Sequence, residues 1–267
     1  MHWPRSGFGT RLRQGLSGNT RVDGFSSEWE EGKKVKKANV SDLLIEIGVE
    51  ELPEAAFRVI NQHLAATAQS KFKESRISHG LISVEITPRR IAFHVEKMVL
   101  KQEDQSLEFS GPSSDKAYDS GGVPTKALEG FLRGKGCELK DVSFKETPKG
   151  KFVSVCKVEK GRLTKAVLPE LLNETFSSLP FPKMMRWEAS GFKFPRPIRW
   201  VVALLGDTTL SFTFAGLKAG NTTYGHRFLS PKAFKVKSSN WKAYAKLLKD
   251  HSVIIALEDR KALIHKA

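Results

Sequence analysis

The chain has 267 residues, of which 40% are hydrophobic and 27% charged, so we expect most of it to fold around a sizeable core. It contains no run of about 18 or more apolar residues, which excludes a transmembrane helix of ordinary length. Its 44 basic and 29 acidic residues give a formal net charge of +15. This excess favours a polyanionic partner such as a nucleic acid over a basic surface that is merely solvated.

Residues 1–40 differ in composition from the rest of the chain. They open with "MHWPRSGFGTRLRQGLSGNTR", which has no acidic residue and is similar to an organellar transit peptide, and continue with a charged linker, "SSEWEEGKKVKK". A disordered extension without a targeting role explains the same composition. The two cysteines, Cys137 and Cys156, lack metal-ligand spacing, so we expect free thiols in a reducing compartment and no zinc site.

Secondary-structure signals begin near Ser41. Apolar runs rich in β-branched or alternating residues predict strands, and apolar residues three and four positions apart predict helices. We expect strands or paired strands over 43–49, 81–87, 91–99, 142–159, 198–206, 210–217 and 252–257, helices over 50–75, 124–136, 164–178, 241–250 and from 258 onward, and a loop over 111–124.

These elements alternate without a regular βαβ rhythm and without an internal repeat, which predicts the α+β class. We expect residues 41–160 and 161–267 to form two packed α+β subdomains behind the extension 1–40. The sequence contains neither the phosphate-binding pattern G-x-x-x-x-G-K-[ST] nor a G-x-G-x-x-G after a strand. It therefore predicts no P-loop and no Rossmann unit.

Three short segments carry groups that could act chemically. The carboxylates of Glu46, Glu50 and Glu51 could form an acid–base or metal cluster, but Glu50 and Glu51 also suit the start of the helix that follows. "TPRR" (87–90) places two guanidinium groups at a turn. Because neighbouring strand residues point to opposite faces, we expect at most one of them to serve a given ligand, and ion pairs with Glu85 or Glu96 are an alternative.

The third segment, "AGNTTYGHRF" (219–228), combines glycines with Asn, His and Arg side chains that could contact RNA. A general-base role for His226 is the weaker interpretation, because no Ser or Cys nucleophile pattern accompanies it. Two Arg-Trp pairs, at 186–187 and 199–200, flank a Phe- and Pro-rich stretch. We interpret Trp187 and Trp200 as packing anchors and the arginines as groups left to face a partner.

Six segments in order resemble the beta-subunit family of the bacterial-type, two-subunit glycyl-tRNA synthetase. They are "LLIEIGVEELP" (43–53), "TPRRIAFHV" (87–95), "GPSSDKAYDSGGVPTKALEGF" (111–131), "LPFPKMMRW" (179–187), "FPRPIRWVVALLG" (194–206) and "AGNTTYGHRF" (219–228). The first departs from the family pattern at Val49, where a Thr is usual. The resemblance covers the chain from about Leu43 to its end, and the family's beta chain continues well beyond this length.

The resemblance implies the N-terminal portion of an enzyme subunit that supports ATP-dependent attachment of glycine to its tRNA. It implies an alpha2beta2 assembly in which the alpha subunit binds ATP and Mg and carries the reaction, while the beta subunit binds glycine tRNA. On this basis we expect no catalytic residue, cofactor or metal in this chain, no membrane association, and no aminoacylation by the chain alone. The expected location is the cytoplasm, or an organelle if residues 1–40 are a transit peptide.

Within the matching segments, the charged or forked side chains are the candidates for contact with tRNA or a partner. They are Arg89, Arg90, Arg186, Arg196, Arg199, His226 and Arg227. For each of them an ion pair or a packing role is the alternative. For the whole chain, the alternatives are a standalone RNA-binding protein and a protein-interaction scaffold without a role in aminoacylation.

Overall fold

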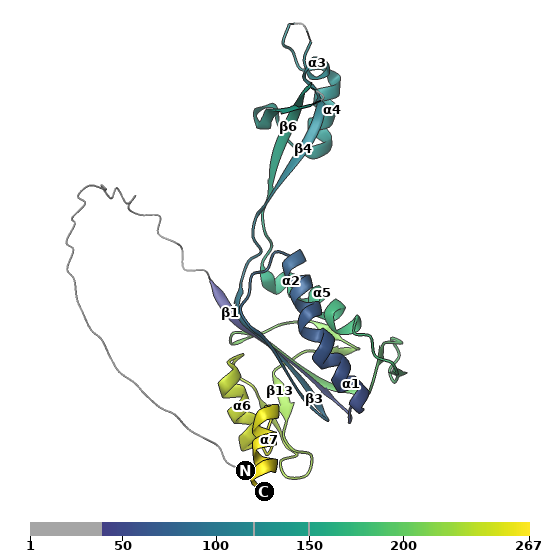
Figure 1. The fold of residues 1–267 in the computed structure, drawn as a ribbon, viewed down its shortest axis with the longest axis vertical. Coiled ribbons are helices and arrows are strands. Elements are labelled where there is room, and N and C mark those ends of the chain that lie inside the picture. Colours follow the sequence, from purple (N-terminus) through teal and green to yellow (C-terminus); the bar gives the residue numbers. More distant parts are fainter. Residues whose placement is uncertain (1–38, 120, 149) are drawn as a thin grey trace, which may run out of the picture. The chain divides into compact units, whose positions relative to one another are not determined.

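The computed structural model describes residues 39–119, 121–148 and 150–267 (Figure 1). Helices are mixed with antiparallel strand pairs, which confirms the α+β class. The first strand begins at Val40, close to the predicted start of folded sequence. The expectations for residues 1–38 lie outside the described residues.

The largest sheet has five strands and gathers segments from both halves of the sequence. Its strand order is β10 (Thr208–Thr209), β9 (Ile198–Leu205), β1 (Val40–Val49), β3 (Arg90–Val99) and β2 (Ile82–Thr87). The strands predicted over 43–49, 81–87, 91–99 and 198–206 are confirmed. The central strand, β1, is hydrogen-bonded on one side to β3 and on the other to β9.

Both faces of β1 are buried, and its alternating side chains enter two different cores. Leu43, Ile45 and Ile47 contribute to the larger core, beneath the helices, whereas Leu44 belongs to a second core on the opposite face. The first face is covered by a helical layer of α1 (Glu54–Val59), the π-helical turn η1 (Ile60–Leu64), α2 (Ala65–Glu74) and α5 (Thr164–Ser177) (Figure 1). The second face is covered by α6 (Trp241–Asp250) (Figure 1).

The predicted helix over 50–75 is confirmed as a continuous helical segment from Glu54 to Glu74. It starts directly after Pro53, whose extended backbone makes it the N-cap residue. Ile60, Leu64 and Ala68 recur at four-residue steps and are fully buried. The helical spacing in the sequence therefore marked the face that covers the sheet.

A separate three-stranded sheet is formed between residues 105 and 159. It has the order β4 (Gln105–Ser113), β6 (Gly150–Glu159) and β5 (Val142–Thr147), accompanied by α3 (Ser114–Ala117), α4 (Lys126–Lys135) and the 3-10 turn η2 (Leu139–Asp141). Its own small core contains Leu128, Leu132, Val153 and Val155. The helix predicted over 124–136 and the hairpin over 142–159 are confirmed. The loop expected over 111–124 is only partly correct, because it includes the end of β4 and α3.

The boundary expected near residue 160 does not separate two compact units. β1 precedes this boundary and β9 follows it, yet the two strands pair from Leu43 to Val49 in one sheet. The physical reason is that β1 is central and needs a neighbour on each side, which β3 and β9 supply. The segment with its own sheet and core is 105–159, inserted between β3 and α5.

Of two further predicted strands, one is only partly correct and one is wrong. The stretch 210–217 is broken by a two-residue turn at Ala215 and Gly216, both with positive φ, between β11 (Thr213–Phe214) and β12 (Leu217–Lys218). The stretch 252–257 forms no strand, and Arg260 donates hydrogen bonds to the carbonyls of Ile254 and Ile255. The remaining elements are β7 (Met185–Arg186), β8 (Lys193–Phe194), β13 (Thr222–Tyr224), β14 (Ala233–Lys235) and α7 (Leu257–Lys266).

Candidate functional site

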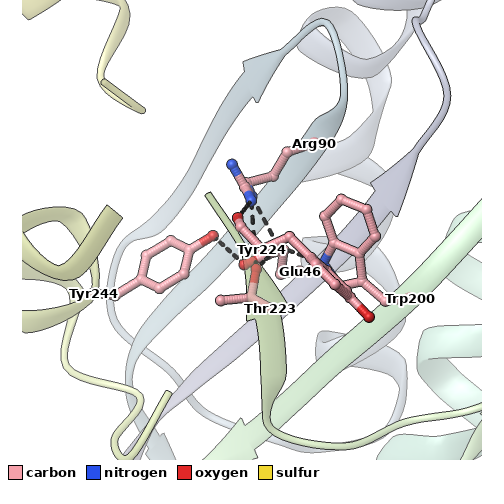
Figure 2. Close-up of polar contacts among 6 residues, drawn as sticks. All are labelled: Glu46, Arg90, Trp200, Thr223, Tyr224 and Tyr244. Atoms are coloured by element: carbon pink, nitrogen blue, oxygen red, sulfur yellow. Dashed lines mark hydrogen bonds and ion pairs between the residues drawn. The ribbon is translucent and has the colours of Figure 1, made fainter. Parts of the chain in front are cut away.

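A buried carboxylate lies at the centre of the second face of the sheet. Glu46 points from β1 toward α6, and its side chain has no exposed surface. Its Oε1 accepts hydrogen bonds from Arg90 Nε (2.8 Å), Trp200 Nε1 (2.7 Å) and Thr223 Oγ1 (2.5 Å), and its Oε2 accepts one from Tyr244 Oη (2.6 Å) (Figure 2). One side chain thus connects β1 with β3, β9, β13 and α6.

The charges of this network compensate each other inside the protein. The Arg90 side chain is also almost completely buried, and burial alone would lower its pKa, but the adjacent Glu46 carboxylate raises the pKa above its ordinary value. Burial, with the charge of Glu46 as a second cause, raises the pKa of Tyr244 well above its usual range. Arg90 therefore stays cationic and the Tyr244 hydroxyl stays a donor, which satisfies the buried carboxylate.

The indole of Trp200 fits this network because residue 48 is a glycine. A Cβ atom at Gly48 would lie 1.9 Å from Cε2 of Trp200, so any larger residue would displace the ring. The ring also lies 4.9 Å from the Tyr224 ring, centroid to centroid, and 5.7 Å from the guanidinium carbon of Arg90. The packing role predicted for Trp200 is confirmed, and its hydrogen bond to Glu46 adds to it. Trp187 likewise packs against the larger core.

A pocket of about 690 Å³ adjoins this network. It is bordered by the turn between β2 and β3, the start of β9, the segment after β13 and the segment after α6. Its lining residues are Glu50, Glu51, Thr87, Pro88, Arg89, Arg90, Arg199, Trp200, Tyr224, Gly225, His226, Arg227, Phe228, Pro231, Ser252, Val253 and Ile254. The volume lies within the range of small-ligand sites.

The arginines of the pocket wall are only partly neutralised. Arg89 Nη2 and Arg199 Nε share the Glu50 carboxylate at the long distances of 3.5 and 3.4 Å. The Nε atom of Arg89 is buried and has no hydrogen-bond partner in the described part of the chain. Arg227 contacts the ring of Phe228 at 5.7 Å and forms no ion pair among the described residues. These guanidinium groups retain donors for an anion.

His226 organises the loop that borders the pocket. Its Nδ1 accepts hydrogen bonds from the backbone N–H groups of Phe228 and Leu229, each at 3.2 Å, so a proton on the neutral ring lies on Nε2. Its own backbone N–H donates to the carbonyl of His251 at 3.0 Å. A Cβ atom at Gly225 would lie 2.6 Å from that carbonyl oxygen, so glycine permits the close approach of the two segments.

The structure brings five of the seven candidate residues to one pocket: Arg89, Arg90, Arg199, His226 and Arg227. The other two lie elsewhere. Arg186 is exposed on β7, and Arg196 donates from Nε to the backbone carbonyl of Glu51 at 2.9 Å.

The structure places Arg89 in the turn before β3 and Arg90 at the start of β3, and both line the pocket. Because the Arg90 side chain is buried against Glu46, it remains a prediction that at most one of them serves a given ligand. They pair with Glu50 and Glu46, not with Glu85 or Glu96. The three glutamates do not converge either: Glu46 is enclosed in the network, while Glu50 and Glu51 line the pocket wall.

Thr223, Tyr244 and Phe228 are parts of this region that the sequence interpretation missed. A charged Glu46 within the apolar run "LLIEIGV" was the available signal, since a carboxylate in such a strand requires buried donors. In the described residues, no group of three or more His, Cys, Asp or Glu side chains is placed to hold a metal ion. None of the described helices combines the length and apolarity needed to cross a membrane.

Comparisons with known proteins identify relatives for most of the chain. Residues 43–267 match the family "Glycyl-tRNA synthetase beta subunit". Proteins named glycine–tRNA ligase beta subunit are 39% identical over 223 residues in Syntrophomonas wolfei, 37% over 224 in Syntrophus aciditrophicus and 37% over 229 in Hahella chejuensis. These matches cover 84–85% of this chain but only 32–33% of each relative, so the chain spans about a third of their length. The chain belongs to the glycyl-tRNA synthetase beta-subunit family.

Proposed function

We propose that this chain is the tRNA-contacting N-terminal part of a glycine–tRNA ligase beta subunit, which supports ATP-dependent attachment of glycine to tRNA. The observation that carries the proposal is the convergence of Arg89, Arg199 and Arg227 on one pocket, in segments that match the family. The formal net charge of +15 supports the same conclusion, because a basic surface attracts the phosphates of RNA.

The geometry suits phosphate contact more than catalysis. The guanidinium groups of Arg89 and Arg199 both contact the Glu50 carboxylate, at distances too long for strong hydrogen bonds. Their remaining N–H donors can therefore bind phosphate oxygens. Arg90 has a different role, because Glu46 already neutralises it and fixes it in the floor of the pocket. His226 holds the adjacent loop through its Nδ1 atom, and no carboxylate of the described residues forms an ion pair with it.

The proposal includes a division of labour between two subunits. ATP and Mg bind to the alpha subunit, which carries the reaction, and the beta chain contributes tRNA contacts within an alpha2beta2 assembly. The relatives' names support the presence of a second kind of subunit, since each is called a beta subunit. The chain alone is then inactive in aminoacylation.

The proposal is tested by filter binding of glycine tRNA to the full 267-residue chain. Arg89→Gln and Arg227→Gln each remove one phosphate contact and should weaken tRNA binding. Arg58→Gln is the matched control, because Arg58 is exposed on α1, pairs with Glu54 and does not line the pocket. Absence of tRNA binding by the unmodified chain, or equal affinities for all four proteins, would contradict the proposal. Equal affinity for an unrelated structured RNA would favour a standalone RNA-binding protein.

A protein-interaction scaffold is the second candidate, and one surface favours a protein contact. Met184 and Met185 are 48% and 41% exposed beside the exposed Arg186 in the β7 region. Adjacent exposed methionines are typical of adaptable protein-binding surfaces. Co-purification with the alpha subunit tests this contact: Met184→Ser with Met185→Ser should reduce recovery of the alpha subunit and leave tRNA affinity unchanged. Loss of alpha binding in a chain that never binds tRNA would favour the scaffold.

A further inference from the structure

The net positive charge of the pocket is close in magnitude to the negative charge of one phosphodiester. Four arginines contribute to its wall and floor, while Glu50 and Glu51 lie in the wall and Glu46 lies beneath the floor. Four positive charges against three negative ones leave a single positive charge. Such a balance suits one phosphodiester better than the two negative charges of a terminal phosphate or the charges of a triphosphate.

The exposed aromatic ring at the pocket distinguishes this site from a simple phosphate site. Phe228 lines the pocket, and this residue is 80% exposed. The ring of His226 lies 6.2 Å away, and its Nδ1 accepts the Phe228 backbone N–H, so the phenylalanine is carried by an ordered turn. An aromatic ring presented in this way beside Arg227 offers a flat apolar surface on which a nucleobase can stack.

The size and the remaining polar groups define the ligand further. A volume of about 690 Å³ accommodates one or two nucleotides but not the width of an RNA duplex. The carboxylates of Glu50 and Glu51 repel phosphate, yet they can accept hydrogen bonds from an exocyclic amino group or a ribose hydroxyl. The pocket therefore combines a phosphate side, a stacking side and acceptors for a nucleoside.

We propose that this pocket binds one unpaired nucleotide of an RNA strand, with its phosphate at Arg89, Arg199 and Arg227 and its base against Phe228. The proposal rests on the proposed tRNA contact and makes it more specific: the pocket selects an unpaired segment over a duplex. Trp200 and Tyr224 form the inner aromatic side of the pocket and are fixed by packing against each other and by the Glu46 bond of the indole.

The test is fluorescence anisotropy of a labelled single-stranded hexaribonucleotide mixed with the full chain. Phe228→Ala should weaken binding by about 5- to 150-fold, which corresponds to the loss of one stacked base. Phe144→Ala is the matched control, because Phe144 is also exposed (46%) but belongs to β5, away from the pocket lining. Equal thermal midpoints of both variants show that each remains folded. Unchanged affinity of the Phe228 variant would overturn the proposal.

Two further measurements distinguish an unpaired RNA strand from a duplex and from a free mononucleotide. The same hexamer paired with its complement should bind at least tenfold more weakly, and unlabelled AMP should displace the hexamer only poorly. Equal binding of the duplex, or tighter binding of AMP than of the hexamer, would overturn the proposal. If the Phe228 variant binds both glycine tRNA and the hexamer normally, the nucleotide pocket is refuted while the proposed tRNA contact stands. If the unmodified chain binds no RNA, both fail.

Discussion

Replacing Glu46 with glutamine tests whether the buried network holds the second face of the sheet together. The substitution keeps the size of the side chain but removes the charge that compensates Arg90, which lies 2.8 Å away and is equally buried. Removing one partner of a buried ion pair costs about 3–5 kcal/mol, because the other charge remains without compensation. For a domain of this size, each kcal/mol lowers the melting temperature by about 2–4 °C, so we expect a decrease of roughly 6–20 °C.

The assay is thermal and urea unfolding of the full chain, followed by circular dichroism. Glu54→Gln is the control, because Glu54 forms an exposed ion pair with Arg58 on α1; we expect no measurable change in its midpoint.

The double variant Glu46→Gln with Arg90→Met makes the test sharper. Once the buried cation is also removed, no charge is left uncompensated, so the double variant should be more stable than Glu46→Gln alone. If the free energy of unfolding of Glu46→Gln falls by less than about 1 kcal/mol, the reasoning is refuted, since breaking a buried pair costs more than that. It is also refuted if the decrease in the double variant equals the sum of the decreases in the two single variants.

Two other substitutions and one pH series test neighbouring features. Gly48→Ala should lower the melting temperature, because the added Cβ would overlap the Trp200 ring, and a midpoint equal to the unmodified chain would contradict this packing. Gly225→Ala should weaken RNA binding and stability together, because its Cβ would press on a backbone carbonyl. Burial lowers the pKa of His94 below 6.5, although Asp42 and Glu96 oppose this shift. The unfolded chain therefore binds this proton at higher pH, and stability should fall as pH decreases below about 6.5, by at most about 1.4 kcal/mol per pH unit. In His94→Gln that fall should be shallower in urea titrations, and an unchanged slope would contradict the assignment.

Much of the fold follows from local patterns in the sequence. The apolar runs of β1, β3 and β9 and the four-residue spacing of Ile60, Leu64 and Ala68 are properties of neighbouring residues, so they predict the sheet and its helical cover. The stretch 252–257 has the same strand-like composition, but it does not pair with an edge strand of the sheet. Local composition does not indicate which segments find a pairing partner.

The candidate site was predictable in part, for a related reason. Arg89, Arg199 and Arg227 lie in turns or near strand starts within segments that resemble the family. They could therefore be predicted as contact residues from the sequence without knowledge of the fold. The network beneath them was not, because Thr223 and Tyr244 lie 177 and 198 residues from Glu46 along the chain. A polar strand such as β4, with alternating exposed residues, also gave no clear apolar signal.

The most direct test of the central claim is the salt dependence of glycine tRNA binding. Each phosphate contact contributes about 0.7–0.9 to the slope of log affinity against log salt concentration. Substituting Arg89, Arg199 and Arg227 together with glutamine should therefore reduce the slope by about 2–3, whereas Arg58→Gln should leave it unchanged. Identical slopes for the triple variant and the unmodified chain would contradict the claim that this pocket contacts the tRNA backbone.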